Sequence, residues 1–143
     1  MISTLRLMTL STLLYLSGGL TAIAGELVII AHPSIQHPLD ADFVSQLYLG
    51  KQRSYQNGID FIPLQLPEDD PLRRQFTEQV LNKSPSQLRA YWAKRIFTGK
   101  GKPPSSAVNR NQAIKLVLED RQFLSYADID TIDAKQFRVI RLK

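Results

Sequence analysis

The chain has 143 residues and a formal net charge of +5, from 18 Lys and Arg against 13 Asp and Glu. It has no cysteine, which excludes a disulfide framework and a lipid anchor on an N-terminal cysteine. A charge of this size permits attraction to an acidic partner but does not require one.

The N-terminus has the pattern of a secretory signal peptide. Arg6 precedes an apolar run over residues 7–20, and the small-residue pattern Ala22-Ile23-Ala24 follows. A retained membrane anchor is the alternative, but hydroxyl side chains interrupt the run, which is shorter than the roughly 20 apolar residues of a span. We predict cleavage after Ala24, a periplasmic mature chain of formal charge about +4 without a membrane span, and no nucleic-acid partner.

The mature part, residues 25–143, shows no repeat or linker and is predicted to form one domain. Residues 26–31 are a continuous β-branched apolar run, which predicts a strand buried on both faces. Asp40 is placed to cap a helix that ends at Gly50. Residues 59–66 predict a second strand, and Asp70-Pro71 predicts the start of a second helix. The side chains expected to face the core from the two helices are Phe43, Val44, Leu47, Tyr48, Leu72, Phe76, Val80 and Leu81.

In the second half, Ser84 and Gln87 have the spacing of a capping box, which predicts a third helix. Its core-facing side chains are expected to be Leu88, Tyr91, Trp92 and Ile96, with an exposed stacking platform at Tyr91 and Trp92 as the alternative. A lysine-bearing loop then leads to a helix over 109–119 and to strands over 123–126 and 137–142. This order of elements predicts an α/β fold, a mixed β-sheet flanked by helices.

Four short motifs follow one another along the mature chain: Leu27-Val28-Ile29-Ile30-Ala31, Tyr48-Leu49-Gly50-Lys51, Phe97-Thr98-Gly99-Lys100-Gly101 and Leu124-Ser125-Tyr126-Ala127-Asp128. Together they resemble the phosphate substrate-binding proteins of ABC importers, in particular a short PstS-like group. The resemblance covers nearly the whole mature chain and implies a single lobe of a type-2 periplasmic-binding-protein fold. Full-length members have two lobes that clamp the ligand, whereas this chain is long enough for only one.

The resemblance also points to a turn. In the phosphate binders, the strand that matches residues 61–66 leads into an Arg-bearing Gly-Ser-Gly-Thr turn, whose N–H groups and helix dipole hold the anion. The serine position falls on Asp70, and its glycine neighbours on Asp69 and Pro71. The threonine position falls on Leu72, and the arginine position on Gln65 or Leu66.

By this resemblance, the candidate ligand-binding residues are Asp69, Asp70 and Arg73. Phosphate binding there is opposed by Glu68, Asp69 and Asp70, since two like charges about 4 Å apart repel by on the order of 1 kcal/mol in water. Pro71 also lacks an N–H donor. We therefore predict a degenerate phosphate site.

A second candidate is a basic surface for an anionic partner, at Lys94, Arg95, Lys100 and Lys102. No acidic residue occurs between Lys94 and Arg110, and Arg89 lies one helical turn before this stretch. A solvated helix face followed by a loop is the alternative.

His32 and His37 share one Pro-rich loop with Asp40. A metal site is conceivable there, but the spacing is loose, and we predict no metal and no cofactor. No nucleophile elbow or H-E-x-x-H pair occurs in the sequence, so no catalytic residue and no enzyme activity are expected.

Two functions stay open. The first is an exported solute-binding-like protein that takes a small anion. The second is a ligand-free accessory or sensory protein of the cell envelope that binds another protein through its basic face. No seam in the sequence predicts a homo-oligomer.

Overall fold

The computed structural model describes residues 25–56 and 58–142, so the expected signal peptide lies outside the described residues. A five-stranded sheet forms the centre of the domain, with strand order β3-β2-β4-β1-β5. Its strands are β1 Leu27–Ala31, β2 Ile62–Gln65, β3 Ser105–Ser106, β4 Phe123–Asp128 and β5 Arg138–Arg141. β1 runs antiparallel to β4 and β5, while β2 runs parallel to β4 and β3. The predicted mixed sheet is therefore confirmed.

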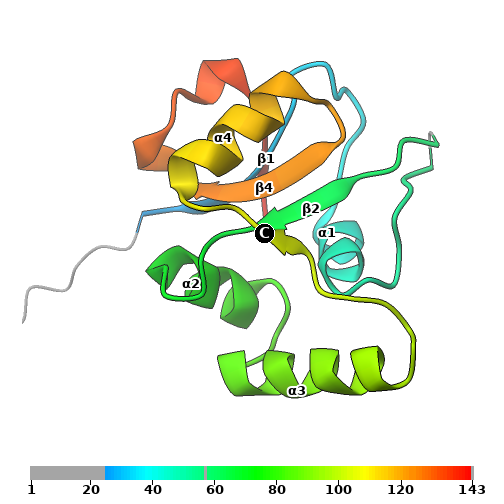
Figure 1. Ribbon diagram of the computed structural model, residues 1–143. Helices are drawn as coiled ribbons and strands as arrows, with labels where there is room; N and C mark the ends of the chain where they lie inside the picture. Colours follow the sequence, from blue (N-terminus) through cyan, green and yellow to red (C-terminus); the bar gives the residue numbers. More distant parts are fainter. Residues whose placement is uncertain (1–24, 57, 143) are drawn as a thin grey trace, which may run out of the picture.

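Helices cover both faces of this sheet (Figure 1). They are α1 Ala41–Tyr48, α2 Pro71–Gln79, α3 Pro85–Phe97 and α4 Arg110–Glu119, and two short 3-10 turns, Ile129–Thr131 and Ala134–Gln136, precede β5. α4 lies on one face with these turns, and α1 and α2 lie on the other. α3 packs against α2 and lies further from the sheet than the other helices.

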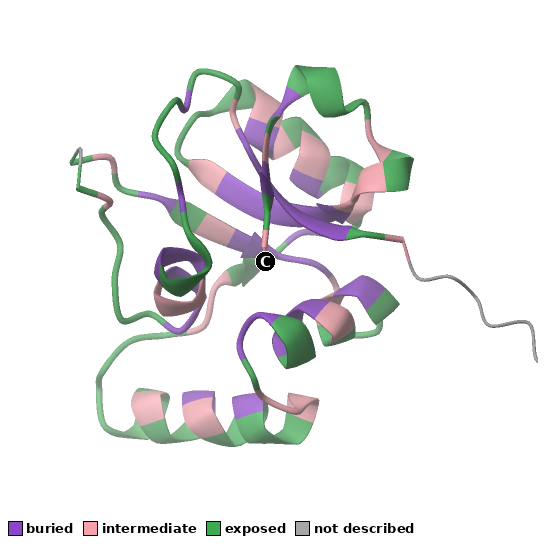
Figure 2. Cartoon of the chain, turned by 180° about the vertical axis from the view of Figure 1, so that it is seen from behind, coloured by how far each residue is buried: buried purple, intermediate pink, exposed green. Residues whose placement is uncertain are grey.

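The side chains of β1 contribute to two hydrophobic clusters, one on each face of the sheet. They point alternately to the two faces, so Leu27, Ile29 and Ala31 join the larger cluster under α1 and α2. Val28 and Ile30 join the smaller cluster under α4. All five residues are buried, as Figure 2 shows along the strand. The prediction of a strand buried on both faces is confirmed.

The predicted helix starts are confirmed by their caps. The Asp40 carboxylate accepts a hydrogen bond from the Phe43 N–H at 2.7 Å. Ser84 and Gln87 form the reciprocal capping box of α3, and Asn109 caps α4. These local hydrogen bonds satisfy backbone N–H groups that a helix leaves without partners at its start.

Two features differ from the expectations. The predicted inward position of Ile96 is wrong, because its side chain is 56% exposed and the last turn of α3 extends beyond α2. β3 was not expected, since Ser105 and Ser106 are both exposed and carry no apolar alternation. It forms because Leu64 and Gln65 of β2 offer a free edge to which the loop adds in parallel register.

Gly50 allows the chain to turn after α1 beneath the ring of Trp92. Its φ is +67°, and a Cβ there would lie 2.9 Å from Cη2 of Trp92. Gly50→Ala is expected to lower the free energy of unfolding by about 2–3 kcal/mol, because backbone strain and the close contact add. Gly99→Ala is the matched control, with φ +68° and open space around the new Cβ, and should cost only about 1 kcal/mol. Urea unfolding of both variants measures the difference; equal losses would contradict the role of the Trp92 contact.

Candidate functional site

The N-termini of α2 and α4 meet near the carboxyl end of β2. The segment 66–70, which we call the β2–α2 turn, leads from the strand into α2. Beside it lies an open depression of about 460 Å³, lined by Pro67, Asp69, Asp70, Pro71, Asn109, Arg110 and Asn111. The N-termini of helices favour negative charge, because their first N–H groups point outward and the helix dipole is positive there.

Asp70 connects the two helices. Its Oδ1 caps α2 by accepting the Leu72 N–H at 2.9 Å. The Arg110 guanidinium donates to both carboxylate oxygens, from Nε to Oδ2 at 2.7 Å and from Nη2 to Oδ1 at 2.6 Å. Such a two-bonded arginine–carboxylate pair is among the stronger charge-assisted contacts in proteins.

The electrostatics of the pair agree with this geometry. The hydrogen bonds from Arg110 lower the pKa of Asp70 against the opposing effect of burial. The hydrogen bonds to Asp70 raise the pKa of Arg110. The Asp70 side chain is only 12% exposed, and that of Arg110 is 39% exposed. Both groups are therefore charged at neutral pH, and they neutralise one another.

The residues that the sequence placed at this turn lie in different surroundings. Asp69 is exposed and lines the depression with Asp70. The Arg73 side chain lies under the β2–α2 turn, where its Nη1 donates a hydrogen bond to the Leu66 carbonyl at 2.9 Å. Glu68 faces α3, with its Oε1 3.6 Å from Nη1 of Arg89. The three carboxylates therefore do not converge on one point.

Arg110 belongs to this candidate site, but its sequence position did not assign it to the turn. In the sequence, Arg110 is the last residue of the basic stretch that begins at Lys94, and 40 positions separate it from Asp70. A signal existed, since Asn109 predicts a helix start and the following residue lies at the positive end of that helix. Which helix start faces which turn follows only from the sheet order.

An aromatic cluster under the turn holds its backbone. The Tyr126 hydroxyl oxygen accepts the Leu66 N–H at 3.1 Å. Its ring stacks on Phe76, with centroids 4.1 Å apart and planes 5° apart. Burial raises the pKa of Tyr126 well above that of a free tyrosine, so this hydroxyl is neutral at physiological pH.

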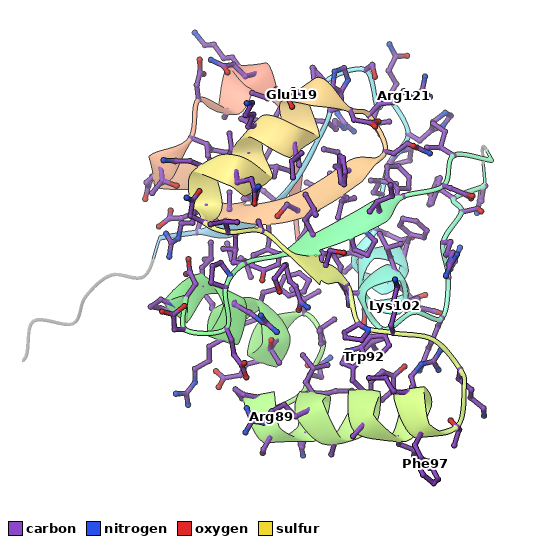
Figure 3. All side chains as sticks on the ribbon, in the orientation of Figure 1. Arg89, Trp92, Phe97, Lys102, Glu119 and Arg121 are labelled. Carbon is purple, nitrogen blue, oxygen red and sulfur yellow. The ribbon has the colours of Figure 1, made fainter. Side chains whose placement is uncertain are left out.

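The predicted basic surface does not form one uniform face. The Arg95 side chain is folded inward, with Nη2 donating to the carbonyls of Gly50 at 3.1 Å and of Lys100 at 2.9 Å. Lys94 is exposed on α3. Lys100 and Lys102 border a separate cavity next to Trp92, and Figure 3 shows Trp92 and Lys102 on the side of α3 that faces the sheet.

The two histidines contact different residues. His32 Nδ1 lies 2.7 Å from the Ser34 hydroxyl, and the His37 ring lies beside Tyr55 with centroids 6.4 Å apart. Asp40 is used as the cap of α1. Within residues 25–56 and 58–142, no group of three metal-ligating side chains is found, and no helix is long and apolar enough to cross a bilayer.

Solved structures of similar fold exist. An ABC-type phosphate transport receptor from Vibrio cholerae superposes with a TM-score of 0.59 at 15% identity, over 82% of this chain and 46% of the receptor. A structure from Clostridium perfringens, described as a phosphate ABC transporter substrate-binding protein with bound phosphate, gives a TM-score of 0.60 at 13% identity, over 83% of this chain and 44% of that one. No protein-family model and no curated protein sequence matches the chain.

These likenesses define the class of fold. The chain has the mixed α/β fold of a single lobe of a periplasmic-binding-protein-like structure, as the sequence predicted. It spans less than half the length of the two phosphate-transport proteins with which it superposes. The fold is thus similar to that of one lobe of these two phosphate-transport proteins.

Proposed function

We propose that this chain is an exported, periplasmic solute-binding-like protein whose phosphate turn is closed by its own carboxylate. The observation that carries the proposal is the Asp70–Arg110 pair, with Asp70 also capping α2. In this arrangement Asp70 occupies the donors that a bound phosphate would otherwise use. Free phosphate must displace a tethered anion and also approach Asp69, so the turn does not bind phosphate.

Thermal unfolding tests the closed turn. The protein is expressed as the full 143-residue sequence and purified from the periplasmic fraction, where its mass also reports cleavage after Ala24. Phosphate and sulfate are compared at matched ionic strength. A specific ligand at 100 times its Kd would stabilise the fold by about 2.7 kcal/mol, and we expect no phosphate-specific shift. A saturable shift with phosphate alone would contradict the proposal.

A pair of serine variants identifies the blocking group. Asp70→Ser keeps a side chain that caps helices but releases Arg110. Phosphate should therefore raise the midpoint temperature of unfolding of this variant in a saturable way. Asp69→Ser is the matched control, because it removes the same charge one residue away and leaves the Asp70–Arg110 pair intact. If Asp70→Ser does not respond, closure by Asp70 is not what prevents binding.

The closed turn also supports a second candidate, a ligand-free accessory or sensory protein of the cell envelope. Phe97, at the end of α3, is 94% exposed, and Ile96 beside it is 56% exposed; Figure 3 shows Phe97 pointing away from the domain. Exposed apolar side chains of this size are typical of protein contacts when they occur together. This candidate requires an envelope protein that is captured by the wild type and lost with Phe97→Ser.

A further inference from the structure

A second cavity lies at the other end of β2 from the Asp70–Arg110 pair. It has a volume of about 400 Å³, within the range of small-molecule sites. Its borders are the first half of β2, the end of α1, Trp92 of α3 and the loop over residues 100–105. None of its lining residues also lines the depression at the β2–α2 turn.

Positive charge predominates around this cavity. Arg53, Lys100 and Lys102 line it, and its one lining acid is Asp60. Asp60 already accepts a hydrogen bond from the Ser54 hydroxyl. Within residues 25–56 and 58–142, no ion pair or hydrogen bond engages the charged groups of the three cations. An excess of two positive charges therefore faces the cavity and favours an anion.

The other lining residues are largely apolar. Ile62 of β2 and Pro103 and Pro104 of the loop present partly exposed apolar surface to the cavity. Trp92 of α3 and Phe61, just before β2, also line it but are only 7% and 3% exposed. Ile62 is 40% exposed although it lies on a strand. A small inorganic anion has no apolar surface to place against such walls, whereas a ligand with an apolar body gains free energy by covering them.

The loop that carries the lysines is held at both ends. Arg95 Nη2 donates to the Lys100 carbonyl at 2.9 Å and to the Gly50 carbonyl at 3.1 Å. At the other end, the buried Gln65 donates from Nε2 to the Pro104 carbonyl at 2.6 Å. The Arg95 guanidinium also lies over the Trp92 ring, 5.8 Å from its centroid. The backbone of the loop is therefore in place before a ligand arrives, which lowers the entropic cost of binding.

We propose that this cavity, the lysine pocket, binds an organic anion in which a carboxylate is joined to an aromatic or aliphatic body. The carboxylate meets Lys100, Lys102 and Arg53, and the body lies against Ile62, Pro103 and Pro104, next to Trp92. This site is separate from the β2–α2 turn, so it does not depend on whether that turn is closed to phosphate.

An NMR titration tests the pocket with defined probes. Trp92 is the only tryptophan in the sequence, so its indole N–H gives a single signal in the ¹⁵N-labelled protein, purified after expression of the full sequence. The probes are 2-naphthoate, its neutral counterpart 2-naphthamide, and inorganic phosphate. We expect a saturable shift of this signal with 2-naphthoate and no saturable shift with phosphate. The affinity for 2-naphthamide should be weaker than that for 2-naphthoate by a factor of about ten or more. Equal binding of the two naphthalene probes, or no shift with either, would overturn the proposal.

Charge variants locate the bound carboxylate. Lys100→Gln/Lys102→Gln should weaken 2-naphthoate binding about tenfold and reduce its salt dependence. Lys94→Gln/Lys135→Gln changes the net charge equally at exposed positions outside the pocket and should leave the affinity within twofold. Trp92 also borders a groove between α2 and α3, so an unchanged affinity in the Lys100/Lys102 variant would place the probe in that groove and overturn the assignment. Equal weakening by both double variants would overturn it as well.

Discussion

Phe76→Ala is expected to lower the free energy of unfolding by about 3–5 kcal/mol, the largest loss that we predict for a single substitution. Phe76 is buried between two tyrosine rings, stacked on Tyr126 at 4.1 Å and tilted against Tyr48 at 4.6 Å. Its removal leaves a cavity and also frees two rings whose hydroxyls bond backbone. The Tyr48 hydroxyl donates to the carbonyls of Leu64 in β2 and Leu124 in β4. Loss of Phe76 should therefore also weaken the contact between these two strands.

Urea unfolding followed by circular dichroism measures this loss. Phe97→Ala is the matched control, because the same side chain is removed where it is 94% exposed, and it should change stability by less than about 0.5 kcal/mol. Phe76→Leu, which keeps most of the volume, should fall between the two. A Phe76→Ala loss below about 2 kcal/mol would mean that the three rings do not support one another.

Local sequence signals were sufficient for the helix starts. Asp40, Ser84 and Asn109 each satisfy N–H groups within three residues of themselves, so the reason for each helix start is contained in a few consecutive residues. The strand at 27–31 was equally accessible, because burial on both faces leaves a continuous apolar run in the sequence.

Elements whose position depends on a distant partner could not be predicted in the same way. β3 is a strand because β2 lies beside it, and its own two serines carry no signal. Ile96 has the spacing of a core position, but the extent of α2 decides which turns of α3 are covered. Periodicity indicates which side chains share a face, and tertiary packing decides whether that face is buried.

The candidate site follows the same rule. The sequence placed Asp69 and Asp70 at the β2–α2 turn, and both line the depression there. It offered Arg73 as the cation of the turn, yet Arg73 bonds the Leu66 carbonyl, and the neighbouring Arg74 pairs with Glu78 along α2. The cation that meets Asp70 comes from α4, which the parallel pairing of β2 and β4 brings alongside.

Arg110→Gln is expected to lower the free energy of unfolding by about 2 kcal/mol at pH 7. Loss of the guanidinium leaves the Asp70 carboxylate, 12% exposed, with only the Leu72 N–H as a partner. Breaking a fully buried pair costs about 3–5 kcal/mol, and the smaller figure here reflects the 39% exposure of Arg110, which allows solvent to screen the pair.

The pH dependence of this loss has a definite sign. Arg110 lowers the pKa of Asp70 in the folded protein, whereas an aspartate in the unfolded chain titrates near about 3.9. The stabilisation by the pair is therefore complete above that value and is lost as the pH falls through the lower folded pKa. The difference between wild type and Arg110→Gln should be constant from about pH 5 to 8 and should shrink below about pH 4.

A double-mutant cycle separates the pair from its surroundings. In an Asp70→Asn background the helix cap is kept, and Arg110→Gln should cost less than half as much, because no carboxylate is left to be stranded. Arg74→Gln removes the partner of Glu78 on the exposed face of α2 and should cost less than about 1 kcal/mol. If Arg110→Gln costs no more than Arg74→Gln, the pair is an ordinary surface contact. Asp70 would then be free to turn away, and the closure of the β2–α2 turn would lose its physical basis.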